Sequence, residues 1–217
     1  MKSLIKIIVI IAVCFALTFL IVKLSGVLTI EQIENWLTHA QSNSGLYVAV
    51  IICLLLFCDL FIAIPTLTVT IFSGYFLGLY IGAIVAFTGM FLAGMCGYGL
   101  SRYYGERLLV FLVKDQVKRS EAINAFEQHG FVMILLSRAL PILPEVSACL
   151  SGMTGMPIKK FVFAWLMSTL PYVLIASFVG SISSFDNPKP AIYGAMGISL
   201  FLWTAWYFYH HKVNSKV

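Results

Sequence analysis

Long apolar runs alternate with short polar segments along the whole chain. Residues 4–24 form the first apolar run, which is about the length that a helix needs to cross a hydrocarbon core of roughly 30 Å. Residues 161–180 and 191–209 form two more runs of similar length, and polar residues concentrate at 25–45 and 101–130. The pattern predicts an all-α integral membrane protein, with full spans at these three runs.

The apolar run that starts at Leu46 is too long for one span and has an unusual interruption. It continues to about residue 100 and is broken only at 59–65, where the sequence DLFIAIP is itself largely apolar. A turn exposed to water would be polar, whereas a turn buried inside the protein at mid-depth can be apolar. We therefore expect a re-entrant hairpin at 46–78, followed by a fourth full span at 79–100.

A second interrupted run, residues 131–157, carries Arg138, Pro141, Pro144 and Glu145 near its middle. We expect a second re-entrant hairpin there, with its tip near 138–144. The segment IPTLTVTIFSGYFLG from Ile64 echoes LPEVSACLSGMTG from Leu143, since each has a proline followed by a Ser-Gly pair. With four full spans the hairpins enter from opposite sides, an inverted repeat of the kind that places a binding site near the membrane midplane.

The polar segments predict short amphipathic helices at the membrane surface. Residues 29–40 form one such helix, and 101–130 are expected to form two, the second starting at Ser120 and ending at Gly130. The chain then divides into residues 1–45, an N-terminal span with an interfacial helix, and residues 46–217, a single membrane domain.

Composition supports a membrane location, and the distribution of Lys and Arg predicts the orientation of the chain in the membrane. Hydrophobic residues make up 60% and charged residues 11% of the chain, against about 25% charged in soluble domains. With a cytoplasmic N-terminus, eleven Lys or Arg residues face the cytoplasm and only Lys23 and Lys189 face outward. We expect a bacterial inner or plasma membrane with both termini cytoplasmic. The net charge of +5 comes without a basic, aromatic-rich face, so nucleic acid is not an expected partner.

Three charged residues in the interrupted runs are the candidate functional groups. A charge at mid-bilayer costs about 2.5–3.5 kcal/mol on insertion scales, and intramembrane charges are usually functional. Arg138 suits a phosphate group, although a structural ion pair with Asp59 or Glu145 stays open. Asp59 and Glu145 are expected to couple or gate transport by binding a proton or sodium ion. The alternative for Glu145 is a place in the first turn of a helix after Pro144.

The remaining predictions concern the small residues of the interrupted runs, and the metal binding and catalysis that the sequence excludes. Pro144, Ser147 and Ser151 are predicted to help bind the substrate. Gly74, Gly78 and Gly82 recur every four residues and predict a flat helical face for packing. The five cysteines lie in apolar runs without metal-ligand spacing, the histidines lie at membrane edges, and no HExxH motif occurs. We expect no metal, no cofactor and no enzymatic activity.

Two segments resemble a known family. Residues 73–105 and 129–156 are similar to the two halves of the DedA/VTT superfamily of membrane proteins, and look closest to its Golgi-membrane (Tvp) branch. DedA proper tends to carry a second arginine after the prolines, where this chain has Pro-Glu-Val-Ser at 144–147. The resemblance implies two opposed re-entrant hairpins, movement of lipids between leaflets, and functional roles for Asp59, Glu145 and Arg138.

The expected function is therefore that of a transporter moving an anionic lipid or polyprenyl phosphate between leaflets. A small-ion or metabolite transporter with the same fold, and a membrane scaffold without transport activity, are the alternatives. Whether the protein forms a homo-oligomer stays open.

Overall fold

A computed structural model describes residues 5, 7–13, 16, 17, 20, 33, 35, 45–62, 64–139, 142–183 and 189–214. All regular elements in these ranges are helices: α3 (Gly45–Cys58), α4 (Thr66–Leu112), α5 (Gln116–Leu136), the 3₁₀ helix η1 (Ser137–Ala139), α6 (Leu143–Met153), α7 (Ile158–Ser181) and α8 (Lys189–Asn214). The predicted all-α class is confirmed. The described residues within 4–24 are helical, and the expected helix at 29–40 lies outside the described residues except for Ile33 and Asn35.

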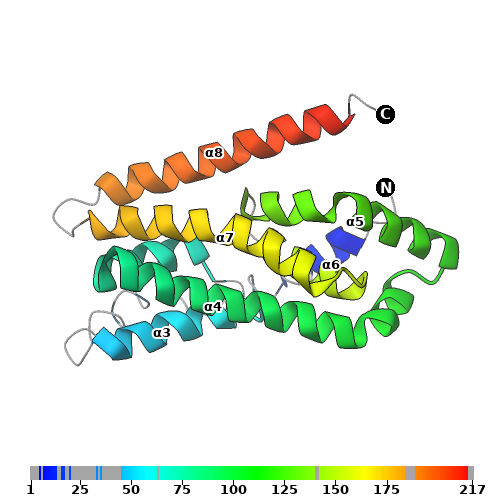
Figure 1. Cartoon of the computed structure of the whole chain (residues 1–217), viewed down its shortest axis with the longest axis horizontal. Coiled ribbons are helices and arrows are strands. Elements are labelled where there is room, and N and C mark those ends of the chain that lie inside the picture. Colours follow the sequence, from blue (N-terminus) through cyan, green and yellow to red (C-terminus); the bar gives the residue numbers. More distant parts are fainter. Residues whose placement is uncertain are drawn as a thin grey trace.

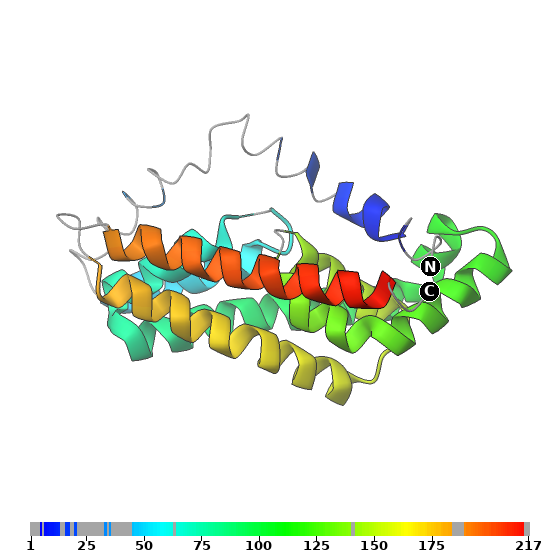
Figure 2. The same cartoon turned by 90° about the horizontal axis from the view of Figure 1, so that it is seen from above.

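Helix α7 lies alongside the longer part of α4, which runs in the opposite direction, and these two helices form the most extensive contact in the described part of the chain (Figure 1). The Tyr98 ring stacks on Phe161 with centroids 4.7 Å apart, and Gly94 lies against Trp165. These contacts show that the two helices are antiparallel. Helix α8 lies along the side of α7, as the view from above shows (Figure 2).

The first half of the chain contains a break and then a reversal. After α3, one carboxyl oxygen of Asp59 accepts a 2.7 Å hydrogen bond from the Ile64 N–H, and a new helix starts at Thr66. This helix is interrupted at Gly78, where φ is 77° and ψ is 174°, a conformation that is essentially restricted to glycine. The Ser73 hydroxyl donates a 2.7 Å hydrogen bond to the Gly82 carbonyl across the reversal. Thr66–Leu77 is therefore a short arm that folds back against the rest of α4.

Both halves of the chain follow the same plan. A Cβ atom at Gly89 would lie 2.7 Å from the Cys53 carbonyl oxygen, and one at Gly97 would lie 2.9 Å from Leu60, so α3 runs parallel to the long part of α4. In the second half, Phe131 stacks on Phe163 and Ser168 donates to the Leu135 carbonyl, so α5 runs parallel to α7. Each short arm, Thr66–Leu77 or α6, is followed by a glycine with positive φ, Gly78 or Gly155.

The short arm of each half packs against the long helix of the other half. The first arm packs on α7, where an added Cβ at Gly74 would clash with the Ser177 backbone, and one at Gly180 with that of Ile71. Helix α6 packs on α4, where a Cβ at Gly152 would clash with the Tyr98 carbonyl. Glycine at these crossings lets the backbones approach closely. Each half is thus held in place by the long helix of the other half.

The expected flat face of Gly74, Gly78 and Gly82 is wrong. The helix reverses at Gly78, and no atom lies within 4 Å of a Cβ built there. Gly74 contacts α7, whereas Gly82 contacts Ser73 on the opposing arm. The two outer glycines do permit close packing, but they pack against different segments because Gly78 separates their helices.

The predicted helix ends within 101–130 are also wrong. Helix α4 continues to Leu112 without a separate surface helix, and α5 begins at Gln116 rather than at Ser120. Asp115 caps α5 by accepting from the backbone N–H groups of Val117 and Lys118. The bond from the Lys118 N–H lowers the pKa of the Asp115 carboxyl below its usual value. Gly130 is buried inside α5, which runs on to Leu136.

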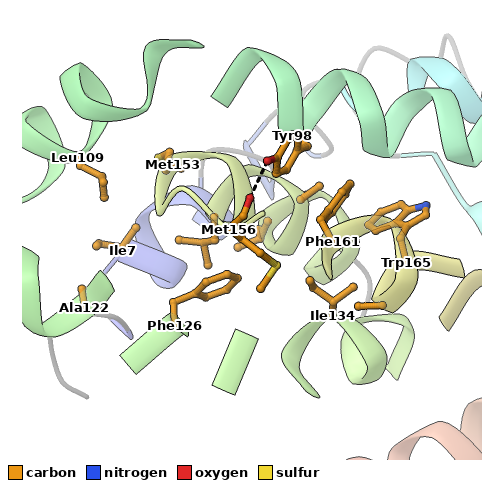
Figure 3. Close-up of a cluster of buried hydrophobic side chains, with 14 of the residues drawn as sticks. Ile7, Tyr98, Leu109, Ala122, Phe126, Ile134, Met153, Met156, Phe161 and Trp165 are labelled. Atoms are coloured by element: carbon orange, nitrogen blue, oxygen red, sulfur yellow. Dashed lines mark hydrogen bonds between the residues drawn. The ribbon is translucent and has the colours of Figure 1, made fainter. Parts of the chain in front are cut away.

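An apolar cluster joins α4, α5, α6 and α7 (Figure 3). Phe126 and Phe161 are fully buried in it, and the Tyr98 hydroxyl donates a 2.6 Å hydrogen bond to the Met156 carbonyl. The outer face of α7 is equally apolar: its large side chains, about half exposed, include Phe163, Met167, Leu174, Ile175 and Phe178. An exposed apolar surface of this extent is typical of lipid contact.

Two helices in the described part of the chain are long and apolar enough to cross a membrane, Leu79–Gly105 and Ile158–Ser181. They coincide with the expected spans 79–100 and 161–180. In α8 the apolar stretch is shorter, Ile192–Phe201.

Candidate functional site

The two chain breaks meet at one pocket. Asp59 from the first break and Arg138 and Glu145 from the second line it together with Trp165 of α7. Apolar or small residues complete the lining: Leu56, Leu60, Met90, Ala93, Gly94 and Ala148. The volume is about 10 Å³, which is room for about one water molecule. The structure thus brings together the three charged residues that the sequence singled out.

Arg138 is held by α7. Its guanidinium carbon lies 5.2 Å from the centre of the Trp165 ring and 5.3 Å from that of Tyr172, within the range of cation–π attraction. One terminal nitrogen donates a 3.2 Å hydrogen bond to the Thr169 hydroxyl. The Nε atom is buried and has no hydrogen-bond partner.

Arg138 forms no ion pair with either carboxylate. Among the described residues, the one ion pair shorter than 4.0 Å joins Lys118 and Asp115 on the surface. The structural pair that the sequence left open, Arg138 with Asp59 or with Glu145, is therefore absent from this part of the chain. The arginine charge is instead stabilised by aromatic faces and a hydroxyl, which leaves donor capacity for a ligand.

Asp59 and Glu145 bring two carboxyl groups to the pocket. Asp59 is buried, with 6% of its surface exposed, and one of its carboxyl oxygens accepts from the Ile64 N–H. Two ionised carboxylates in so small a space repel each other. The arrangement therefore suits the binding of a small cation or a proton between them.

Glu145 lies in the first turn of α6, directly after Pro144, as the alternative for this residue predicted. The residue before this helix, Ile142, has φ 75°, which is a genuine outlier for a β-branched side chain. Strain of this kind costs on the order of 1–3 kcal/mol and clusters at ligand sites and switches. The strained turn lies between Arg138 and Glu145 in the sequence and sets the start of the helix that carries Glu145.

The structure does not bring Ser147 and Ser151 to this pocket. The Ser147 hydroxyl donates to the Pro144 carbonyl at 2.8 Å, and the Ser151 hydroxyl donates to the Ser147 carbonyl at 2.6 Å. Ser147 also lines a second cavity of about 100 Å³, together with Ile8, Met133, Leu136, Leu143, Val146 and Leu150. Pro144 is buried and shapes the start of α6. The predicted substrate contacts of the two serines are thus not supported.

Sequence reasoning missed the three residues of α7 that hold Arg138. Trp165, Thr169 and Tyr172 are spaced at four and three residues and so share one helical face. That spacing of polar and aromatic side chains within an apolar span was the available signal. None of the three is charged, so none stood out from the run 161–180.

Comparison with known proteins gives consistent matches. The family model of the VTT domain matches residues 64–182. Undecaprenyl phosphate transporter A of Bacillus subtilis is 27% identical over 167 residues, which cover 70% of this chain and 76% of that protein. Two uncharacterized membrane proteins from Buchnera aphidicola subspecies are 26% and 25% identical, cover 72% of this chain, and are themselves covered to 68% and 66%. No solved structure gives a significant match.

Proposed function

The chain belongs to the VTT-domain (DedA) family of membrane proteins, and from this premise we propose that it moves an anionic lipid of the polyprenyl-phosphate class between the two leaflets. The substrate class is suggested by the name of the Bacillus subtilis relative. The observation that carries the proposal is the state of Arg138, a half-buried cation that forms no ion pair within 4.0 Å among the described residues and whose Nε has no hydrogen-bond partner. Such a guanidinium is suited to a phosphate.

The carboxyl pair supports a coupling role. A phosphate monoester brings a charge of about −1.5 to −2 at neutral pH, and two ionised carboxylates in the same pocket would repel it. Protonation of the Asp59–Glu145 pair removes part of that repulsion, so a proton enters with the lipid and leaves after it. A sodium ion at the same pair would serve the same purpose.

The proposed membrane arrangement follows the two halves of the fold. The breaks at 59–65 and 137–142 lie near the midplane as the tips of two opposed re-entrant hairpins, and four helices cross completely. The ends of α4 and α7 that carry Arg102, Arg107, Lys159 and Lys160 then face the cytoplasm, together with both termini. Bacterial relatives favour the bacterial inner membrane.

A proteoliposome experiment tests the proposal. The protein is reconstituted into vesicles that contain undecaprenyl phosphate, and a phosphatase that cannot cross the bilayer is added outside. Without transport, phosphate is released only from the outer leaflet and the reaction stops at about half of the lipid. With the wild-type protein, release is expected to continue to near completion.

The variants Arg138→Ala and Glu145→Gln are expected to stop release at the outer-leaflet level while inserting normally. Lys118→Ala and Glu127→Gln remove an exposed cation and an exposed carboxylate outside the pocket and are expected to behave as the wild type. Full activity of both pocket variants would contradict the proposal. A wild-type protein without leaflet exchange would favour a scaffold or a transporter of small ions.

A further inference from the structure

Trp165 is a polar residue of the pocket as well as an aromatic one. Three buried side-chain polar atoms in the described part of the chain have no hydrogen-bond partner: Arg138 Nε, Trp165 Nε1 and Ser177 Oγ. The first two belong to residues that line the same pocket. Leaving a buried donor unpaired is unfavourable, and buried donors in native proteins are rarely left unpaired. Two unpaired donors on residues that line one pocket point to a common ligand.

The indole ring of Trp165 lies against a residue of the pocket lining. A Cβ at Gly94, which lines the pocket, would lie 2.5 Å from Cζ2 of Trp165 and 2.6 Å from Cε2, the ring carbon bonded to Nε1. Phe161 packs on the ring with centroids 5.5 Å apart. In Figure 3 the indole nitrogen points away from the apolar cluster. The ring cannot turn its N–H into that cluster without losing these contacts.

The chemistry of the lining selects the ligand. The two unpaired N–H groups are donors, and the carboxyl groups of Asp59 and Glu145, which line the same pocket, offer acceptors. An oxygen atom can accept from both N–H groups at once, while a bound ammonium group offers them no acceptor. The volume of about 10 Å³ admits one such oxygen in the closed pocket.

We propose that Trp165 is a second phosphate-binding residue, whose indole N–H acts with the Nε–H of Arg138 to hold one oxygen atom. A water oxygen occupies this position in the closed pocket, and an oxygen of the lipid phosphate replaces it when substrate enters. The lipid step rests on the proposed function, whereas the water step does not. The paired donors favour phosphate over head groups that end in an amine.

Indole NMR signals test the proposal directly. The chain has four tryptophans, so ¹⁵N-indole labelling in nanodiscs gives few signals, and Trp165→Phe assigns one of them. Without lipid, the Trp165 indole proton is expected to show cross-relaxation to water. Undecaprenyl phosphate is expected to shift this signal downfield and abolish the water contact, whereas undecaprenol is expected to do neither.

The outcomes separate the two proposals. A second sample, labelled with ¹⁵N-arginine, reports the Arg138 Nε signal. If that signal shifts with undecaprenyl phosphate but the Trp165 indole signal does not, phosphate binds without Trp165 and the inference is wrong. If neither signal shifts, the proposed phosphate site is wrong as well. Absence of any water contact at Trp165 before lipid is added overturns the water step.

Binding measurements distinguish the contribution of the indole N–H to affinity from that of the aromatic ring. Replacement of Trp165 by 3-benzothienylalanine keeps the fused ring but exchanges the N–H for sulfur. This replacement and Trp165→Phe are expected to weaken binding of undecaprenyl phosphate about tenfold, the loss expected for one hydrogen bond to a charged group. Tyr98→Phe, which removes a buried hydrogen bond outside the pocket, is expected to keep the wild-type affinity. Wild-type affinity in the benzothienyl protein would show that the N–H is not a ligand.

Discussion

The charge of Arg138 sets the chemistry of the pocket. Arginine does not lose its proton in proteins, so the half-buried guanidinium stays positive whatever the two carboxyl groups do. A direct ion pair with Asp59 would have used the same donors that a phosphate needs. Two aromatic faces and the Thr169 hydroxyl orient the guanidinium without neutralising it.

Thr169 is expected to act through Arg138. Thr169→Val keeps the shape of the side chain but removes the oxygen that accepts from the guanidinium, which corresponds to about 0.5–1.5 kcal/mol for one hydrogen bond. Leaflet exchange of undecaprenyl phosphate should slow by about twofold to tenfold, measured as initial rate in proteoliposomes.

Two controls define that effect. Thr88→Val removes an exposed hydroxyl bonded within α4 and should leave the rate unchanged. In an Arg138→Ala background, Thr169→Val should bring no further loss. An additional loss there would mean that Thr169 acts independently of the arginine.

The charged residues of the site were predicted from the sequence, and the uncharged ones were not. Asp59, Arg138 and Glu145 are costly in an apolar run, so each needed an explanation. Trp165 and Thr169 are ordinary residues of a membrane helix and gave no such signal. The substrate roles of Ser147 and Ser151 stay predictions, because a helical hydroxyl can donate to a carbonyl three or four residues earlier, and sequence does not reveal which acceptor it chooses.

At the scale of elements, the apolar breaks were informative and the glycine spacing was not. An apolar interruption has to be buried, and both interruptions end in the same pocket. A four-residue glycine repeat fits a packed helix face, but it equally fits two helices joined at a reversal. Only the backbone angles at Gly78 distinguish these two arrangements.

Gly78→Ala is expected to destabilise the protein by about 1–3 kcal/mol, because a side chain disfavours the backbone conformation found there. Added bulk is not the cause, since a Cβ at Gly78 would touch nothing within 4 Å. The matched control is Gly99→Ala in the helical part of α4, which also meets no atom and should be neutral or stabilising. Thermal unfolding of the purified proteins in detergent measures both. Equal stability of the two variants would mean that the reversal at Gly78 is not maintained.

At the scale of the whole molecule, neither half contains a complete site. The first half supplies Asp59, and the second supplies Arg138, Glu145 and the α7 residues that hold the arginine. The Ser-Gly echo in the sequence marks the two crossings, since Gly74 and Gly152 are where the short arms meet the opposite long helix. The echo could predict a repeat, but it could not predict the exchange of arms, because it carries no information about which helix each glycine contacts.

The most direct measurement is a structure of the protein in nanodiscs with undecaprenyl phosphate, determined by electron cryomicroscopy at a resolution that shows side chains. We expect the pocket to be wider than in the lipid-free protein, with the phosphate between the Arg138 guanidinium and the Asp59–Glu145 pair. A phosphate bound only at the outer ends of the helices, with the pocket still closed around Arg138, would contradict a transport site at the meeting point of the two breaks.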